Sequence, residues 1–145
     1  MAGGGGEDSA CWIDRAALAI SVDLLMKQCH EAAVRGGWWT DLHTGADLHS
    51  LPGEPPKRNV PEQLCLIHSE ISEALEGYRK NIPDKGLPHR PALEVELADA
   101  LIRIFDLAGG LGLDLPGALV EKMVYNTQRA DHTPASRLAA GGKLF

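Results

Sequence analysis

Apolar residues recur every three to four positions in four stretches of the chain, and this spacing predicts four helices. They are expected over residues 13 to about 35, about 61 to 80, 94 to 113, and 115 to about 129. Gly, Pro and Asp gather between these stretches, and Asn59 and Asp114 suit the capping positions before the second and fourth helices. No stretch alternates as a strand would. The pattern predicts an all-α chain with a four-helix bundle-like domain.

The second and third predicted helices each have a distinctive apolar pattern. The second carries a stripe of large residues that is expected to face the core: Leu64, Ile67, Ile71, Leu75 and Tyr78. The third is apolar on two sides, and a helix that is apolar nearly all round is normally buried. Its second apolar side needs a cover, which predicts a homo-oligomer.

One charged stripe runs along this third helix: Glu96, Asp99, Arg103 and Asp106. Charges inside an otherwise apolar helix are costly unless they are paired or bound to a metal. The stripe is therefore expected to face a partner, an ion or a ligand. Ion pairs to neighbouring helices are the ordinary alternative.

Two carboxylate pairs stand three residues apart, Glu70 with Glu73 and Glu96 with Asp99, so each pair lies on one helix face. Four carboxylates meeting between two helices would repel one another unless a cation neutralised them. Oxygen ligands favour Mg²⁺ or Mn²⁺, and Mg²⁺ usually binds together with substrate phosphates. Such pairs are also common on solvated surfaces, and Glu73 with Glu76 forms a competing register.

Two further features could serve a ligand. Lys122, Asn126 and Arg129 share a face of the fourth predicted helix, and the two basic groups could neutralise phosphate charge. The segment 36–59 is long for a connection in a compact domain, and such loops are often functional. It begins with Trp38 and Trp39, which either pack on the helices or stack on a planar ligand.

Length, charge and cysteine content narrow the class of protein. At 145 residues we expect one domain, 11–131, between a disordered Gly-rich segment, 1–10, and an irregular C-terminal tail, 132–145. The net charge of −6 argues against binding nucleic acid non-specifically. Three cysteines without a CxxC spacing favour reduced thiols and a cytoplasmic location. We expect neither a signal peptide nor a membrane span.

The order of the carboxylate pairs, Glu70-x-x-Glu73 and then Glu96-x-x-Asp99, resembles the signature of the MazG-like all-α nucleoside triphosphate pyrophosphohydrolases. The surrounding segments 68–79 and 96–108 are similar to the second and third helices of that family. The run 122–129, together with Gly141-Gly142-Lys143, is similar to its C-terminal portion. The resemblance covers roughly residues 28 to 143.

This resemblance implies Mg²⁺-dependent hydrolysis of an unmodified or modified nucleoside triphosphate, with a deoxynucleotide as the expected substrate. Water attacks the α-phosphorus and gives the monophosphate and pyrophosphate. The implied metal ligands and catalytic groups are Glu70, Glu73, Glu96 and Asp99, and one of these carboxylates could instead activate the water. The implied phosphate or sugar contacts are Lys122, Asn126 and Arg129.

The resemblance also bears on the base pocket and the assembly. His30 and Trp39 resemble the base-pocket pair of the related dCTP pyrophosphatases, although each could equally be structural. Asp106 could pair with Arg103 rather than touch substrate. Relatives in this family form dimers or tetramers.

Other functions compete with this interpretation. A di-iron carboxylate bundle also has inward glutamates, but it needs Glu-x-x-His on two helices, and no histidine follows Glu70 or Glu96 by three residues. A non-catalytic helical interaction protein would use the two apolar faces for assembly. Within the family, hydrolysis of dUTP or of phosphoribosyl-ATP remains an alternative.

Overall fold

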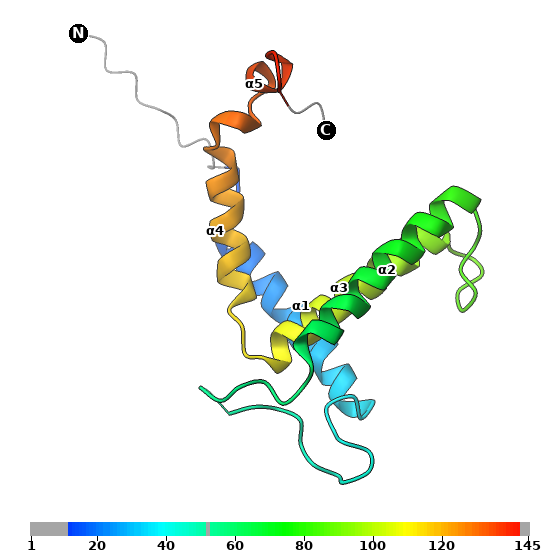
Figure 1. Cartoon of the computed structure of the whole chain (residues 1–145). Helices are drawn as coiled ribbons and strands as arrows, with labels where there is room; N and C mark the ends of the chain where they lie inside the picture. Colours follow the sequence, from blue (N-terminus) through cyan, green and yellow to red (C-terminus); the bar gives the residue numbers. More distant parts are fainter. Residues whose placement is uncertain (1–11, 52, 143–145) are drawn as a thin grey trace. The chain divides into compact units, whose positions relative to one another are not determined.

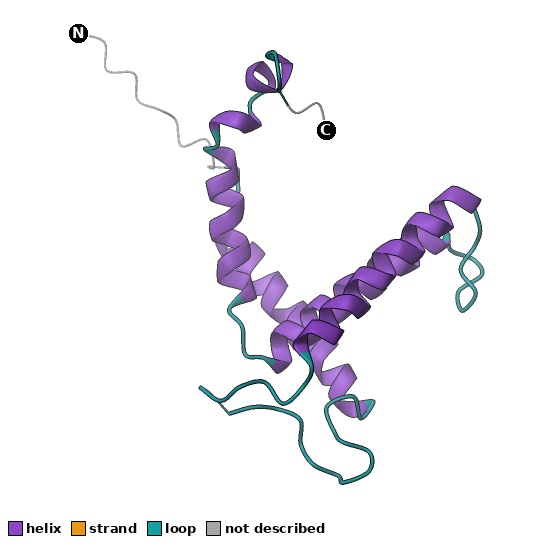
Figure 2. Ribbon diagram, in the orientation of Figure 1, coloured by secondary structure: helices purple, strands orange, loops and turns teal. Residues whose placement is uncertain are grey.

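The computed structural model describes residues 12–51 and 53–142, and these residues contain helices and loops but no strand (Figures 1 and 2). The long helices are α1 (Arg15–Arg35), α2 (Val60–Lys80), α3 (Ala92–Gly110) and α4 (Leu115–Thr127). A short 3₁₀ turn, η1 (Ala130–His132), and a short helix, α5 (Pro134–Leu138), follow. The prediction of an all-α chain is confirmed. The expected disorder of residues 1–10 lies outside the described residues.

The helix ends follow the capping signals in the sequence. The side chain of Asn59 accepts a hydrogen bond from the backbone N–H of Glu62 at the start of α2. Asp114 does the same for Gly117 at the start of α4, with Oδ1 2.9 Å from the nitrogen. These side chains satisfy backbone donors that lack a partner within the helix.

The C-terminal segment is not wholly irregular, contrary to our expectation. The hydroxyl of Thr133 accepts from the backbone N–H of Ser136, and Pro134 occupies the first turn of α5. A capping threonine followed by proline is a helix-start signal. The helix is only five residues long, which is too short to show a repeating apolar pattern.

The chain divides into two compact units. One comprises residues 24–113 and contains the end of α1, the 36–59 segment, α2 and α3. The other combines the start of α1 with residues from Asp114 onward, including α4, η1 and α5. Within the described ranges, no helix is both long enough and apolar enough to cross a bilayer.

Helices α2 and α3 pack side by side as an antiparallel pair (Figure 1). Small residues line the contact, and Gly77 marks its closest point: a Cβ at this position would lie 2.8 Å from Cβ of Ala92. The other buried residues of the two helices are Glu70 and Ala74 of α2, with Ala100, Leu107 and Ala108 of α3. The backbones approach closely because no bulky side chain stands between them.

The stripe of large residues predicted as the core face of α2 is not buried in the single chain, so this prediction was wrong. Leu75 is 58% exposed and Tyr78 69% exposed, and Leu64 and Ile71 are also exposed. On α3, Leu97, Leu101 and Ile102 are exposed as well. Periodicity identified the apolar residues correctly, but the smaller side chains form the contact because they permit a closer approach.

The close contact at Gly77 yields a stability prediction. Alanine normally stabilises a helix relative to glycine by roughly 1 kcal/mol, whereas overpacking costs about 1–3 kcal/mol. We expect Gly77→Ala to lower the free energy of unfolding by about 1 kcal/mol in urea denaturation, because the new Cβ would displace Ala92. Gly86→Ala is the control, because its Cβ would meet only Asp84 Oδ1, at an ordinary 3.4 Å. A Gly77→Ala protein at least as stable as the wild type would contradict this packing.

Candidate metal centre and cavity

Three of the four predicted carboxylates come together between α2 and α3. Glu70 from α2 and Glu96 and Asp99 from α3 each offer an oxygen, and these oxygens all lie within 4.8 Å of one another. We call these three residues the acidic cluster. Glu70 is buried, whereas Glu96 and Asp99 are partly exposed. Glu73 is not a member, but its charge acts on Glu96.

Burial and mutual repulsion both act on the carboxylates of this cluster. Burial, followed by the charges of Glu73 and Glu70, raises the pKa of Glu96 above its ordinary value. Burial and the charge of Glu70 likewise raise the pKa of Asp99, although Arg103 opposes this shift. The carboxylates are therefore incompletely neutralised by the surrounding protein, which is the condition in which a cation binds favourably.

Arg103 supplies the cluster with its positive charge. Its Nε donates to Oε1 of Glu70 across the helix pair, at 2.6 Å. The expected pairing of Arg103 with Asp106 is therefore replaced by a pair between helices. Three of the four residues of the charged stripe thus belong to the acidic cluster or pair with it, while Asp106 has other partners.

Asp106 holds His30 and Trp39 together. Its Oδ1 lies 2.8 Å from Nδ1 of His30 and accepts a hydrogen bond from Nε1 of Trp39 at 2.7 Å. The two rings meet edge to face with centroids 5.1 Å apart. A buried indole N–H needs such an acceptor, so Asp106 stabilises the placement of Trp39.

Trp39 is covered on several sides and only 2% exposed. His49 stacks on it with ring centroids 4.7 Å apart, and the Arg58 guanidinium lies 5.0 Å from the ring centroid. A Cβ at Gly110 would lie 2.0 Å from the indole, so only glycine leaves room there. The structure thus brings the predicted base-pocket pair together, but neither residue lines the adjoining cavity.

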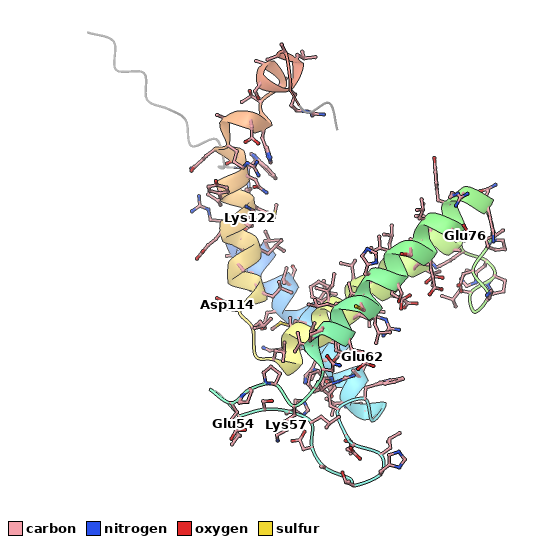
Figure 3. The ribbon with its side chains drawn as sticks, viewed as in Figure 1. Glu54, Lys57, Glu62, Glu76, Asp114 and Lys122 are labelled. Atoms are coloured by element: carbon pink, nitrogen blue, oxygen red, sulfur yellow. The ribbon has the colours of Figure 1, made fainter. Side chains whose placement is uncertain are left out.

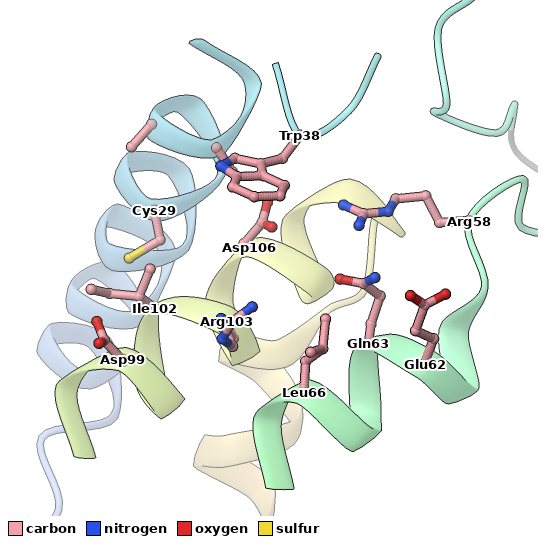
Figure 4. Close-up of a pocket in the computed structure, with 12 residues that line it drawn as sticks. Cys29, Trp38, Arg58, Glu62, Gln63, Leu66, Asp99, Ile102, Arg103 and Asp106 are labelled. Carbon is pink, nitrogen blue, oxygen red and sulfur yellow. The ribbon is translucent and has the colours of Figure 1, made fainter. Parts of the chain in front are cut away.

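That cavity, of about 470 Å³, lies between the end of α1, the start of α2 and the middle of α3 (Figure 4). Asp99 joins it to the acidic cluster, and Arg103 and Asp106 also line it. Trp38, which is 69% exposed, contributes an aromatic face. The remaining lining residues are Cys29, Ala32, Ala33, Arg58, Glu62, Gln63, Leu66 and Ile102.

Sequence reasoning missed Arg58 and Gln63 as cavity residues. The available signal was position, since Arg58 immediately precedes the capping Asn59, and Gln63 lies in the first turns of α2. Residues at the start of a helix that follows a long loop often line binding sites. Periodicity cannot find them, because neither belongs to an apolar or charged repeat.

The predicted phosphate-binding residues come from the other compact unit (Figure 3). Lys122 Nζ lies 4.6 Å from the ring centroid of Tyr125. Arg129 lies just beyond the end of α4 and makes two hydrogen bonds to Asp131. Oδ1 of Asn126 is buried and has no hydrogen-bond partner among the described residues. Their role toward a ligand stays a prediction.

Comparison with known proteins adds no assignment: no family model, curated protein or solved structure matches this chain. Its function must therefore be inferred from its own residues and their geometry.

The raised pKa values of the acidic cluster predict how pH and cations change stability. A carboxylate with a pKa higher in the folded than in the unfolded state binds more protons when folded, so stability falls as pH rises through that window. Glu96 and Asp99 both contribute in this direction. Without divalent cations, we expect Asp99→Asn to melt at a higher temperature than the wild type at pH 8, with the difference shrinking toward pH 5.

Differential scanning fluorimetry with EDTA measures this difference, and added Mg²⁺ should stabilise the wild type more than Asp99→Asn. Glu94→Gln is the matched control, because Glu94 is an exposed carboxylate on the same helix. An Asp99→Asn protein that melts below the wild type in EDTA at pH 8 would show that the cluster is not under repulsion.

Proposed function

We propose that this protein is a Mg²⁺-dependent nucleoside triphosphate pyrophosphohydrolase of the MazG-like kind, which converts its substrate to the monophosphate and pyrophosphate. The observation that carries the proposal is the position of the acidic cluster beside the cavity, with Asp99 belonging to both. A ligand in the cavity would therefore have its charged end next to the carboxylates. A MazG-like bundle fold is part of the same proposal.

The acidic cluster fits a hard divalent cation. Its donors are all carboxylate oxygens, which favour Mg²⁺ or Mn²⁺ over softer metals. Glu70 can keep Arg103 on one oxygen and offer the other, since a carboxylate has two. Glu70, Glu96 and Asp99 would hold the ion, with Glu73 as a further ligand. When bound, the ion would polarise the phosphate and neutralise its charge.

The cavity supplies the other contacts that a nucleotide needs. Arg58 and Arg103 both line it, and guanidinium groups pair well with phosphate oxygens. The exposed indole of Trp38 offers a surface on which a base can stack. A volume of about 470 Å³ falls within the range of about 300–1,000 Å³ that is usual for small-molecule sites.

The reaction itself requires water, a proton acceptor and stabilisation of the leaving group. The water oxygen attacks the α-phosphorus, the bond to the oxygen bridging the α and β phosphates breaks, and pyrophosphate leaves. The water proton would pass to whichever of the four carboxylates, Glu70, Glu73, Glu96 or Asp99, is not bound to the ion. Arg103, which lines the cavity, would offset the negative charge that develops on the phosphates.

Two sets of residues enter the proposal on the resemblance alone. Lys122, Asn126 and Arg129 would bind phosphate or sugar oxygens, and His30 and Trp39 would bind the base. Stacking of a base on Trp39 would require His49 to leave the ring that it now covers. Trp38 needs no such movement, which makes it the simpler stacking surface.

The activity test is a screen of common and oxidised nucleotides with Mg²⁺ that measures pyrophosphate against phosphate. We expect pyrophosphate, and we expect Glu96→Gln and Asp99→Asn to lower kcat by at least about 100-fold, because each removes a carboxylate that would hold the Mg²⁺ against the reacting phosphates. Glu94→Gln should retain full activity, since its carboxylate is exposed and pairs with Arg90. Circular dichroism checks that the variants remain folded.

Phosphate as the product would point to cleavage at the γ-phosphate and against this proposal. Near-normal turnover by Asp99→Asn would separate the activity from the acidic cluster.

A homo-oligomer belongs to the same proposal, because the single chain leaves large apolar residues of α2 uncovered. The stripe that includes Ile71 and Leu75 would be buried between copies. Light scattering is expected to report at least two chains per particle, and Leu75→Glu should shift the population toward the monomer. Lys80→Glu adds the same group on another side of α2 and should leave the assembly intact. A monomeric wild-type protein would refute the assembly.

A further inference from the structure

The imidazole rings of His30 and His49, which come from different elements, face each other through their Nε2 atoms. Nε2 of His30, on α1, lies 3.1 Å from Nε2 of His49, in the 36–59 segment. Their ring planes are nearly perpendicular, at 86°, with centroids 5.2 Å apart. Both side chains are partly open to solvent, at 20% and 32% exposed.

A carboxylate lies behind each ring. Nδ1 of His30 lies 2.8 Å from Oδ1 of Asp106, and Nδ1 of His49 lies 2.5 Å from Oδ1 of Asp47. A carboxylate accepts hydrogen bonds, so each Nδ1 carries the hydrogen. In the neutral rings, the lone pairs are then on the two Nε2 atoms, which face each other. This arrangement is favourable only if a positively charged species lies between the nitrogens.

We propose that His30 and His49 form a binding site for Zn²⁺ or a similar transition-metal cation, separate from the acidic cluster. Imidazole nitrogens favour zinc, copper and nickel, whereas Mg²⁺ prefers oxygen. Zn–N bonds of about 2.0–2.1 Å in tetrahedral geometry place two nitrogens roughly 3.3 Å apart, close to the spacing of His30 and His49. Hydrogen bonding of Nδ1 to a carboxylate is the usual support of a metal-bound histidine.

The site would have two protein ligands, with water in the remaining positions on the exposed side. Among the described residues, the grouping of three or more ligands is the acidic cluster, so no third side chain completes the histidine pair. A bound cation would connect the 36–59 segment to α1. It would also hold His49 against Trp39, because the same ring makes both contacts.

A shared proton is the competing occupant of this pair. One added proton would convert the facing lone pairs into an N–H···N hydrogen bond of the same length. Charged groups near the pair include Asp106 of α3, and Asp47 and Lys57 of the 36–59 segment. The guanidinium of Arg58 lies over Trp39, against which His49 stacks. The two carboxylates would stabilise a proton as well as a metal, so the experiment must separate the two occupants.

The test is isothermal titration of the full, tag-free chain with Zn²⁺ in excess Mg²⁺, which keeps the acidic cluster occupied. We expect about one Zn²⁺ per chain. His49→Phe should abolish this binding, because phenylalanine keeps an aromatic ring against Trp39 but has no nitrogen. Asp47→Asn should weaken it by about 10–100-fold, the usual effect of losing the group that supports a ligand.

The control is His43→Phe, which removes an exposed histidine from the same segment and should leave Zn²⁺ binding unchanged. Electron paramagnetic resonance of the Cu²⁺-loaded chain should show coupling to two nitrogens, which His49→Phe removes. The proposal is overturned if the wild type binds no Zn²⁺, or if His49→Phe binds it as tightly as the wild type. In the first case, joint titration of His30 and His49 by NMR would identify the shared proton.

Discussion

The close approach of α2 and α3 is the constraint on which the candidate site depends. Gly77 faces Ala92 with no space for a Cβ, and further along the same helix pair Glu70 meets Arg103. Glu70 lies on this small-residue face, so packing the helices buries it. A buried carboxylate is stable only with a partner, and Arg103 from the opposite helix is that partner.

The same contact gathers more negative charge than it neutralises. Arg103 pairs with Glu70, while Glu96 and Asp99 from the facing helix bring two further carboxylates within reach of the same point. Burial first, and then the remaining repulsion, raises the pKa values of Glu96 and Asp99. Charged groups whose pKa values are shifted in this way are common at functional sites. Carboxylates that repel one another at the edge of a cavity are suited to binding a cation together with an anionic ligand.

The sequence predicted the features that depend on local spacing. The four long helices, the capping roles of Asn59 and Asp114, and the pairing of Glu96 with Asp99 on one face all follow from neighbours within a few positions. Local spacing does not show which side of α2 packs against α3. The periodic pattern favoured the large residues Ile71 and Leu75 as the packing face. The contact is made by smaller residues, because they let the two helix backbones come closer together.

Local spacing also could not predict contacts between residues that lie far apart in the sequence. Arg103 and Asp106 stand three residues apart on one helix, which favoured a pair between them, yet their partners are Glu70 and His30. Gly110 is the last residue of α3, and its absent side chain leaves space for Trp39. Such contacts depend on how the 36–59 segment folds back, and a segment without periodicity carries little information about its own course.

Asp106 connects the histidine pair, His30 and His49, with the cavity. One of its oxygens serves both His30 and Trp39, and its side chain also lines the cavity. Any species that binds between His30 and His49 therefore acts on a carboxylate that a ligand in the cavity would meet. A cation at the histidine pair would draw electron density through His30 and reduce the effective negative charge of Asp106. That side of the cavity would then repel phosphates less. Binding at the histidine pair would thereby be coupled to binding in the cavity beside the acidic cluster, although the two sites share no ligand residue.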